Sequence, residues 1–262
     1  METDFFTYSR QLAAIDNEVG SFEVAHSRVA TVRRLQKFIG KDEMPFSMVT
    51  PDFVLQFEKR LTNEGLKEST VRFYLNQVRA IYNQAAKDGI VPPIHLLKGV
   101  KSTIPVRKSR ELLAENELKR MRYAELSDSK PLNFARDMFF FSIYGRGISF
   151  NDIAHIKKND VGRFTLTYTS QTINSPRITV RWEPAMQEIA DRYPSNTVYL
   201  FPFIKSEDKE EANREMNRVR ENIQHAFRRI ATRCSLSVVP TMYMTKEIYL
   251  RAIENVSVSK II

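Results

Sequence analysis

Apolar side chains recur at helical spacing through the first hundred residues, and no segment there alternates in the manner of a strand. One stripe predicts a helix that ends at Gly40, and it consists of Val24, Val29, Val32, Leu35 and Phe38. Thr50-Pro51 predicts the start of a second helix, because threonine caps a helix and proline fits its first turn. A third helix is predicted from a Ser69-Thr70 cap to Gly89, with the stripe Val71, Tyr74, Leu75, Val78, Ile81, Tyr82 and Ala85. Together these elements predict a small helical bundle.

The helical pattern stops within residues 90–113. Pro92-Pro93, Gly99 and Pro105 interrupt it, and a basic group follows that consists of Lys101, Arg107, Lys108 and Arg110. We therefore expect a helical domain at residues 1–100, a linker at 101–113 and a second domain at 114–262.

The second domain mixes helical spacing with one strand pair. Helices are predicted at 114–127, at 131–145 and from Glu210 to about Cys234, and Ser149-x-x-Asp152 resembles a capping box. Residues 163–168 and 177–182 alternate as two strands around the turn Asn174-Ser175-Pro176. A final helical piece carries Tyr249. The predicted fold is mainly α with a small β-hairpin: a helical bundle followed by an α+β domain.

Composition limits the class of protein. With 262 residues and 42% apolar content, the chain can bury the cores of two globular domains. A single cysteine excludes an internal disulfide framework and a cysteine-based zinc site. The acidic N-terminus lacks a signal-peptide pattern, and no apolar run is long enough to span a bilayer. We expect a soluble, cytoplasmic protein that makes no membrane contact.

The positive charge lies mainly in the second half. The net charge is +9, yet residues 1–100 hold 13 basic against 12 acidic side chains. Such a bias suits a polyanionic partner such as DNA, because neutralised phosphates release condensed counterions. Charge alone leaves open that the protein binds no acidic partner.

The stretch from Gly65 to Ala85 resembles the SAM-like core-binding domain of phage integrases. In that family, the helix after the serine/threonine cap approaches the DNA backbone. The resemblance therefore implies a set of DNA-binding residues, which are Lys67, Ser69, Thr70, Arg72, Asn76 and Arg79. Hydroxyls, amides and cations are the groups that phosphate contacts use. The alternative is an ordinary solvated helix face.

The second half is similar to the catalytic domain of tyrosine recombinases. Met138–Ile153 resembles the family's first arginine motif, and Lys246–Leu250 resembles its nucleophile segment. The resemblance implies that Arg146 and Tyr249 are catalytic and that a phosphotyrosyl link to double-stranded DNA forms without a cofactor or metal. It also implies a tetramer on two DNA duplexes. The alternatives are a structural arginine and a core tyrosine.

Two features of the family pattern are missing. The hairpin Tyr168–Asn174 has no lysine where the family has one. The family's His-x-x-Arg box is also absent, because Val239–Met244 resembles its lead-in and the nucleophile segment follows at once. The intervening helices are therefore expected to be deleted. His225-Ala-Phe-Arg228 matches the box by spacing, but it falls earlier, on a predicted amphipathic surface helix.

Three functions follow from these patterns. The first is a DNA integrase or site-specific recombinase of a mobile element that is impaired in this copy. Whether it is still an active enzyme is left open. The second is a catalytically inactive DNA-binding protein that occupies recombination sites or pairs with an intact relative. The third, ranked last, is a helical protein-interaction module without a DNA role.

Overall fold

The computed structural model describes residues 4–100, 111–171 and 176–254, and the chain divides into two compact units, residues 1–108 and 109–262. Each unit is described by itself. The predicted basic group Lys101, Arg107, Lys108 and Arg110 lies outside the described residues, as do Asn174 and Ser175 of the predicted turn. The fold is mainly helical with one two-stranded antiparallel sheet, which confirms the predicted class. None of the described helices is long and apolar enough to cross a membrane.

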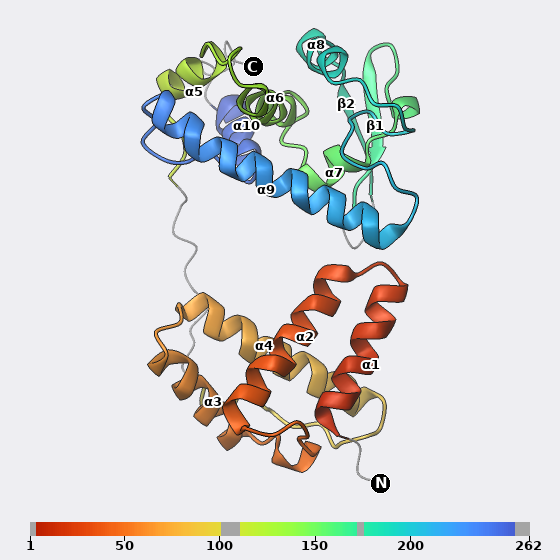
Figure 1. The fold of residues 1–262 in the computed structure, drawn as a ribbon, viewed down its shortest axis with the longest axis vertical. Coiled ribbons are helices and arrows are strands. Elements are labelled where there is room, and N and C mark those ends of the chain that lie inside the picture. The colour runs from red at the N-terminus through yellow and green to blue at the C-terminus, as the bar shows by residue number, and fades with distance from the viewer. Residues whose placement is uncertain (1–3, 101–110, 172–175, 255–262) are drawn as a thin grey trace. The chain divides into compact units, whose positions relative to one another are not determined.

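Among residues 4–100, the first unit contains helices and no strands (Figure 1). Its elements are α1 (Phe5–Glu18), α2 (Phe22–Ile39), the short 3-10 helix η1 (Phe46–Met48), α3 (Pro51–Asn63) and α4 (Glu68–Lys87). The helix α2 packs against α1 and α4, and α3 also packs against α4. The unit is a helical bundle, as the spacing of apolar residues predicts.

Local capping explains most of these boundaries. Thr50 accepts a hydrogen bond from the Phe53 backbone N–H at 3.2 Å, and Pro51 occupies the first helical position, as predicted. Gly40 ends α2 in the left-handed conformation with φ at 67°, which glycine adopts without steric cost.

The predicted Ser69-Thr70 cap of α4 is wrong. The capping residue is Lys67, and both hydroxyl residues lie inside the first helical turn. Glu68 therefore begins the helix, and its acidic side chain suits the positive end of the helix dipole. The predicted stripe is otherwise buried, apart from the partly buried Tyr74. Val24 of the stripe predicted for α2 is 44% exposed, because the buried face of that helix is set instead by Ala25, Val32 and Leu35.

The second unit carries the sheet. In chain order it contains α5 (Glu115–Arg122), α6 (Lys130–Tyr144), α7 (Phe150–His155), the 3-10 helix η2 (Lys158–Asp160), β1 (Thr165–Thr169), β2 (Arg177–Arg181), α8 (Pro184–Arg192), α9 (Lys209–Arg233) and α10 (Met244–Glu254). The strands pair antiparallel, with Thr165 opposite Arg181 and Thr169 opposite Arg177. Both strands lie within two residues of their predicted positions.

The helix α6 is the core of the second unit, and α5, α8, α9 and α10 pack around it. Phe139, Phe140 and Phe141 are at most 4% exposed, so the predicted core role of this aromatic cluster is confirmed. Phe139 meets Phe227 of α9 edge to face at 5.7 Å between ring centroids. A helix that is apolar on nearly all sides requires this complete cover.

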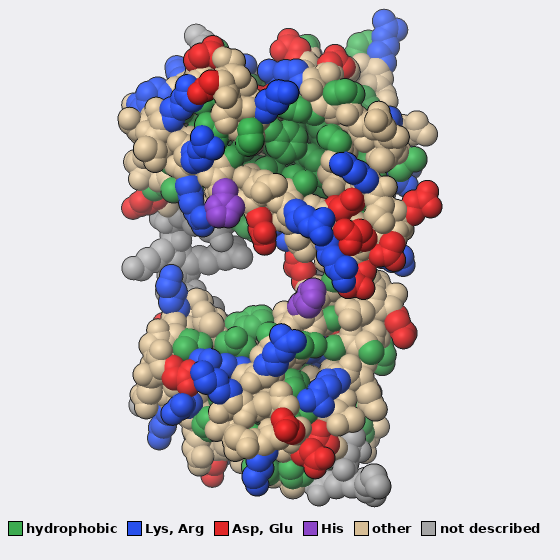
Figure 2. All heavy atoms as spheres, in the orientation of Figure 1, with side chains coloured by type: hydrophobic (Ala, Val, Ile, Leu, Met, Phe, Trp, Pro, Cys, Tyr) green, Lys and Arg blue, Asp and Glu red, His purple; other side chains and the backbone are tan. Residues whose placement is uncertain are grey.

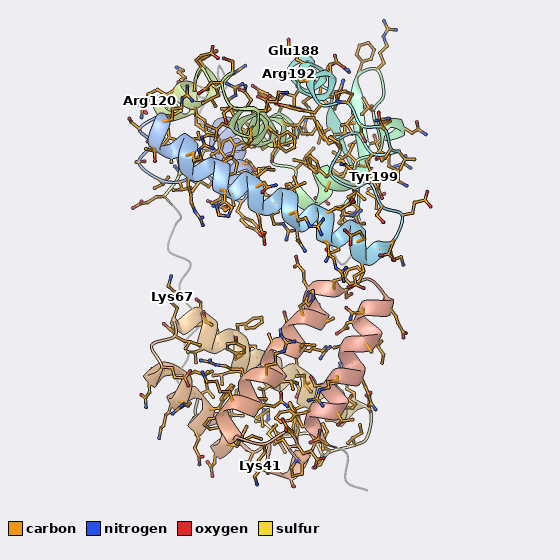
Figure 3. The ribbon with its side chains drawn as sticks, viewed as in Figure 1. Lys41, Lys67, Arg120, Glu188, Arg192 and Tyr199 are labelled. Atoms are coloured by element: carbon orange, nitrogen blue, oxygen red, sulfur yellow. The ribbon has the colours of Figure 1, made fainter. Side chains whose placement is uncertain are left out.

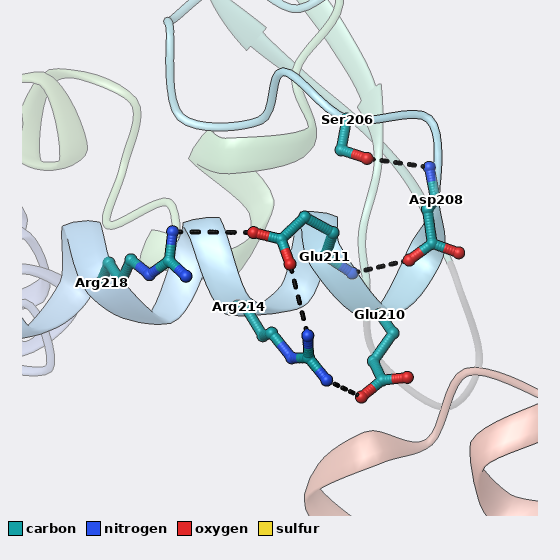
Figure 4. A network of polar contacts seen from close by, with 6 residues as sticks. All are labelled: Ser206, Asp208, Glu210, Glu211, Arg214 and Arg218. Atoms are coloured by element: carbon teal, nitrogen blue, oxygen red, sulfur yellow. Dashed lines mark hydrogen bonds and ion pairs between the residues drawn. The ribbon is translucent and has the colours of Figure 1, made fainter.

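The long helix α9 changes character along its length. Its first turns hold a network in which Asp208 accepts from the Glu211 N–H at 2.8 Å, while Arg214 pairs with Glu210 and Glu211 (Figure 4). Beyond Glu221 the helix contains only basic charges. Exposed pairs of this kind each contribute little to stability.

A buried carboxylate joins α5 to the turn between α9 and α10. Glu117, 6% exposed, accepts hydrogen bonds from the Ser237 N–H at 2.6 Å and the Ala114 N–H at 2.8 Å. These bonds, the one from Ser237 first, lower the pKa of Glu117. Arg120 adds two bonds, from Nε to the Cys234 carbonyl at 3.1 Å and from Nη2 to the Ser235 carbonyl at 2.8 Å. We call these contacts the α5 clasp.

Replacing Glu117 with glutamine keeps one carboxylate-like oxygen but places an NH₂ group among backbone donors. We expect the free energy of unfolding at pH 7 to fall by about 1–3 kcal/mol, measured by urea denaturation. Since the folded-state pKa of Glu117 is lowered, this stability is present above the ordinary carboxyl pKa of about 4.3 and is lost as the pH falls toward the lowered pKa. The difference in the free energy of unfolding between the parent protein and the Glu117→Gln variant should therefore become smaller in acid.

The matched control is Glu115→Gln on the same helix, where the carboxylate makes a half-exposed ion pair with Lys119. This variant should stay within about 0.5 kcal/mol of the parent protein. Equal stability of the Glu117 and Glu115 variants at pH 7 would show that the clasp is dispensable.

Candidate nucleic-acid interface and active site

Arg146 lies in the turn that follows α6. Its backbone N–H donates to the Ile143 carbonyl at 2.9 Å, and its φ of 66° is in the left-handed region. A residue with a Cβ atom enters that region at a cost of roughly 1–2 kcal/mol. The side chain is exposed, and within the described residues it has no ion-pair or hydrogen-bond partner.

Gly147, the next residue, allows α10 to approach this turn. Its φ is 80°, and a Cβ atom added there would lie 2.4 Å from the Cα atom and 2.8 Å from the Cβ atom of Lys246. Real Cβ atoms do not come so close to backbone. Only glycine therefore permits the start of α10 to rest on the Arg146 turn.

Buried hydroxyl groups fix this contact. Ser142 Oγ lies 2.5 Å from the Ile148 carbonyl oxygen and 2.7 Å from Thr245 Oγ1. Thr245 Oγ1 in turn lies 2.7 Å from the Met242 carbonyl oxygen. Ser142 and Thr245 are at most 1% exposed, so the hydrogen bonds that their two hydroxyl protons form among these oxygens are shielded from competing water. We call these contacts the hydroxyl relay; it connects α6, the turn after Arg146 and the first turn of α10.

Asp152 brings the end of β1 to the same region. Ser149 caps α7 by accepting from the Asp152 N–H at 3.0 Å, as the predicted capping box requires. The Asp152 carboxylate accepts from the Gln171 N–H at 2.7 Å and from Ser170 Oγ at 3.2 Å. The carboxylate is 6% exposed, and these bonds offset its burial. The residues that leave β1 are thereby held beside the helix that follows the Arg146 turn.

Tyr249 lies in the middle of α10, half-buried. It is three residues after Lys246, and residues at this spacing share a helix face. The structure thus brings the segment of Tyr249 and the turn of Arg146 to one place through the contact of Gly147 with Lys246. In the described part of the chain the Tyr249 hydroxyl has no hydrogen-bond partner.

The surroundings of Arg146 lack the other expected groups. The residues after β1 are Ser170 and Gln171, a hydroxyl and an amide where the resemblance implies a cation. His225 and Arg228 lie on the exposed side of α9, as predicted, and contact each other, with Arg228 Nη1 3.3 Å from His225 Nδ1. Within the described residues, neither forms a hydrogen bond with Arg146. Among the described residues there is also no group of three metal-ligating side chains.

The α4 residues predicted to bind DNA form one stripe, with one exception. Ser69, Arg72, Asn76 and Arg79 follow at spacings of three and four, which place them along one side of the helix. The buried residues Leu75 and Val78 of the same helix pack into the bundle on another side. Thr70 lies off this line. We call these four residues the α4 stripe.

Charge along the α4 stripe is uneven. Arg72 pairs with Glu68 at 2.7 Å, and its side chain is only 17% exposed. Arg79 is exposed, and within the described residues neither it nor Lys67 has an acidic partner. Lys67 lies where α4 begins (Figure 3). Arg79 and Lys67 are therefore the free cations of this surface, whereas the charge of Arg72 is already partly neutralised.

From the sequence, Lys246 was assigned to the nucleophile segment, but its close approach to the Arg146 turn was not predicted. The signal that could have indicated this residue is the run Gly145-Arg146-Gly147. Two glycines around an exposed arginine suggest that another backbone comes close, but they do not say which one. On the face drawn in Figure 2, basic side chains lie on both units among acidic ones.

Comparison with known proteins concerns the domain and the fold. Residues 4–99 match the family model of the phage integrase SAM-like domain. Among solved structures, the chain is similar to a lambda integrase dimer bound to a COC' core site, with a TM-score of 0.66 at 14% identity over 98% of this chain and 92% of that one. Among the curated proteins, none matches this sequence.

Two further structures have the same fold. A lambda integrase tetramer bound to a Holliday junction gives a TM-score of 0.64 at 15% identity, over 97% of this chain and 74% of that one. The Tn1549 transposon integrase in complex with a circular intermediate DNA gives 0.59 at 11% identity, over 94% and 86%. The predicted resemblance is confirmed at the level of the fold: residues 4–99 match the phage integrase SAM-like domain, and the chain as a whole has the fold of these integrases.

Proposed function

We propose that this protein binds double-stranded DNA as a site-specific recombinase or integrase of a mobile element, and that strand cleavage is impaired in this copy. The observation that carries the proposal is the match of residues 4–99 to the integrase SAM-like domain, within a chain whose whole fold is that of integrases bound to DNA. The net charge of +9 supports a polyanionic partner.

The α4 stripe is our candidate for backbone contact in the first unit. Its hydroxyl, amide and guanidinium groups are the donors that phosphate oxygens accept from, and such contacts position a protein without reading sequence. Lys67 at the start of α4 adds a cation where the helix dipole also favours an anion. Arg79 should contribute more than Arg72, because Glu68 already pairs with Arg72.

In the second unit, Arg146 and Tyr249 are our candidates for catalysis. A tyrosine hydroxyl has an ordinary pKa of about 10, so the phenol must lose its proton as it attacks a phosphodiester. Guanidinium groups stabilise the charge that gathers on the transferring phosphate. Arg146 precedes Gly147, which adjoins α10, and the second arginine that the resemblance implies is missing from the sequence before Tyr249. Loss of a single such donor typically slows a reaction by about 10²–10³. Cleavage should therefore be slight.

The second function that the site favours is catalytically inactive DNA binding. The absence of a hairpin lysine and of a His-x-x-Arg box near Tyr249 favours it, while the α4 stripe is unaffected by either loss. Lambda integrase forms a tetramer on a Holliday junction, and we infer that this chain assembles with copies of itself or with an intact relative on DNA.

Binding to duplex DNA should weaken steeply with salt. Each neutralised phosphate contributes a slope of about 0.9 in a plot of log affinity against log salt concentration. Replacing Arg79 with alanine should reduce the slope by about one and weaken binding on all sequences alike. Fluorescence anisotropy at salt concentrations of roughly 50 to 200 mM measures both effects.

Lys59→Ala on α3 is the matched control, since Lys59 is also an exposed cation of the first unit but lies off the α4 stripe. It should leave the slope nearly unchanged. An affinity that barely changes with salt would instead favour a protein-interaction module.

Cleavage is tested with a nicked duplex that carries the element's own attachment site, followed by denaturing electrophoresis. We expect at most a trace of covalent protein–DNA adduct in the parent protein and none in Tyr249→Phe, because phenylalanine lacks the attacking oxygen. Tyr243→Phe, an exposed tyrosine six residues earlier, is the control and should keep the adduct.

An adduct that persists in Tyr249→Phe would assign the nucleophile to another residue. No adduct in any protein, together with tight and salt-sensitive binding, would favour the inactive DNA-binding protein.

A further inference from the structure

An exposed phenylalanine lies on the outer face of α4. Phe73 is 39% exposed, and its ring meets that of Tyr74 edge to face at 5.3 Å between centroids. It is two residues from the buried Val71 and two from the buried Leu75, and residues two apart on a helix point about 200° apart. Phe73 therefore lies on the face of α4 opposite the core. A single apolar side chain on a surface is ordinary, so its neighbours decide whether it has a function.

The neighbours of Phe73 on this face are uncharged. Gln77 and then Ala80 follow it at spacings of four and three, so the three residues share one side of the helix. Gln77 is partly exposed, and among the residues that the structure describes its side-chain amide has no hydrogen-bond partner. Gln84, which continues the line, instead donates to Asp88 at 2.9 Å. We call Phe73, Gln77 and Ala80 the Phe73 line.

Two arginines of α4 lie to one side of the Phe73 line. Arg72 and Arg79 are seven residues apart, which is about 10 Å along a helix axis. From Ser69 to Lys87 the helix contains no acidic residue. This face therefore combines an apolar side chain and a free amide in its middle with guanidinium groups at one edge, and it has no charge that repels DNA.

The major groove of DNA fits a face of this composition. The groove is about 12 Å wide and admits an α-helix, and each base pair presents a distinct pattern of groups there. Glutamine can form two hydrogen bonds with the edge of adenine, and an apolar side chain can contact the methyl group of thymine. Guanine is read mainly by arginine or lysine, and the Phe73 line contains neither. Its chemistry therefore matches A·T base pairs.

We propose that Phe73 and Gln77 determine which DNA sequence this protein selects. Gln77 binds the edge of an adenine in the major groove, and Phe73 packs on the methyl group of a thymine in that base pair or the next, while the α4 stripe holds the backbone. The inference rests on the proposed function for its ligand, duplex DNA. It goes further because phosphate contacts alone do not distinguish one sequence from another.

Selection from a pool of duplexes with a randomised segment identifies the preferred site of the full chain. We expect the bound duplexes to be enriched in A·T pairs at one or more positions, and Gln77→Ala to lose the preference at one of them. That variant should also bind the selected site about tenfold more weakly, the effect of one lost bidentate base contact. The same enrichment in both proteins would show that Gln77 reads no base.

Uracil in place of thymine tests Phe73, because it removes only the methyl group. The parent protein should bind the selected site about fourfold more weakly when it contains uracil, the effect of one apolar carbon that is no longer buried. Phe73→Ala should bind the thymine and uracil duplexes equally. In the same way, 7-deazaadenine removes the N7 acceptor of adenine and should weaken binding by the parent protein but not by Gln77→Ala.

Phe164→Ala is the matched control, since Phe164 is another exposed phenylalanine and lies just before β1 in the second unit. It should distinguish thymine from uracil as the parent protein does. If Phe73→Ala also distinguishes them, another residue contacts the methyl group and the inference is wrong. The uracil comparison in the parent protein needs no variant, so equal binding of the two duplexes would overturn the inference even if Phe73→Ala proved unstable.

The outcomes separate this inference from the proposed function. Salt-sensitive binding of the parent protein to duplexes of every sequence alike would overturn the reading of bases by α4 and leave DNA binding standing. A lack of affinity for any duplex would overturn the proposed function, and the inference with it. Arg79→Ala should weaken binding to the thymine and uracil duplexes by the same factor, because a phosphate contact carries no sequence information.

Discussion

The absence of a side chain at Gly147 is the constraint on which the candidate active site depends. It allows the first turn of α10 to lie against the turn that carries Arg146, and a Cβ atom there would meet backbone at 2.4 Å. The hydroxyl relay, the burial of Thr245 and the position of Tyr249 all follow from this contact. Close-packed interiors transmit such a displacement instead of absorbing it, so a larger residue would move the whole of α10.

The two units differ in how their charged side chains are arranged. Residues 1–100 have almost no net charge, with 13 basic against 12 acidic side chains, yet they present the α4 stripe on a helix whose other side is buried in the bundle. The second unit carries most of the positive charge, but its acidic and basic residues are neighbours in the first turns of α9 and separate only beyond Glu221. The arrangement of charged side chains on each surface, more than the total charge, therefore decides which surfaces can attract phosphate.

Much of the fold could be predicted from the sequence, because apolar spacing and capping residues are local signals. Thr50-Pro51, Gly40 and the Ser149 cap mark real boundaries, although the Asp152 side chain bonds the Ser149 hydroxyl and does not complete a capping box. The cap of α4 was predicted at the wrong position because Ser69 and Thr70 are good capping residues. Lysine is not a typical capping residue, so only the structure identifies Lys67 as the cap. The resemblance indicated Arg146 and Tyr249, but Lys246 could not be predicted, since its importance arises from a contact with Gly147 about a hundred residues earlier.

The α5 clasp has a consequence for how the chain folds during synthesis. Glu117 bonds to Ser237 across 120 residues, and α6 is covered only once α8, α9 and α10 exist. The first unit draws its contacts from residues 1–108, so it can close on itself as soon as that part leaves the ribosome. The second unit must keep the aromatic side chains of α6 away from other apolar surfaces until α10 has been made. Its dependence on helper proteins in the cell should therefore exceed that of the first unit.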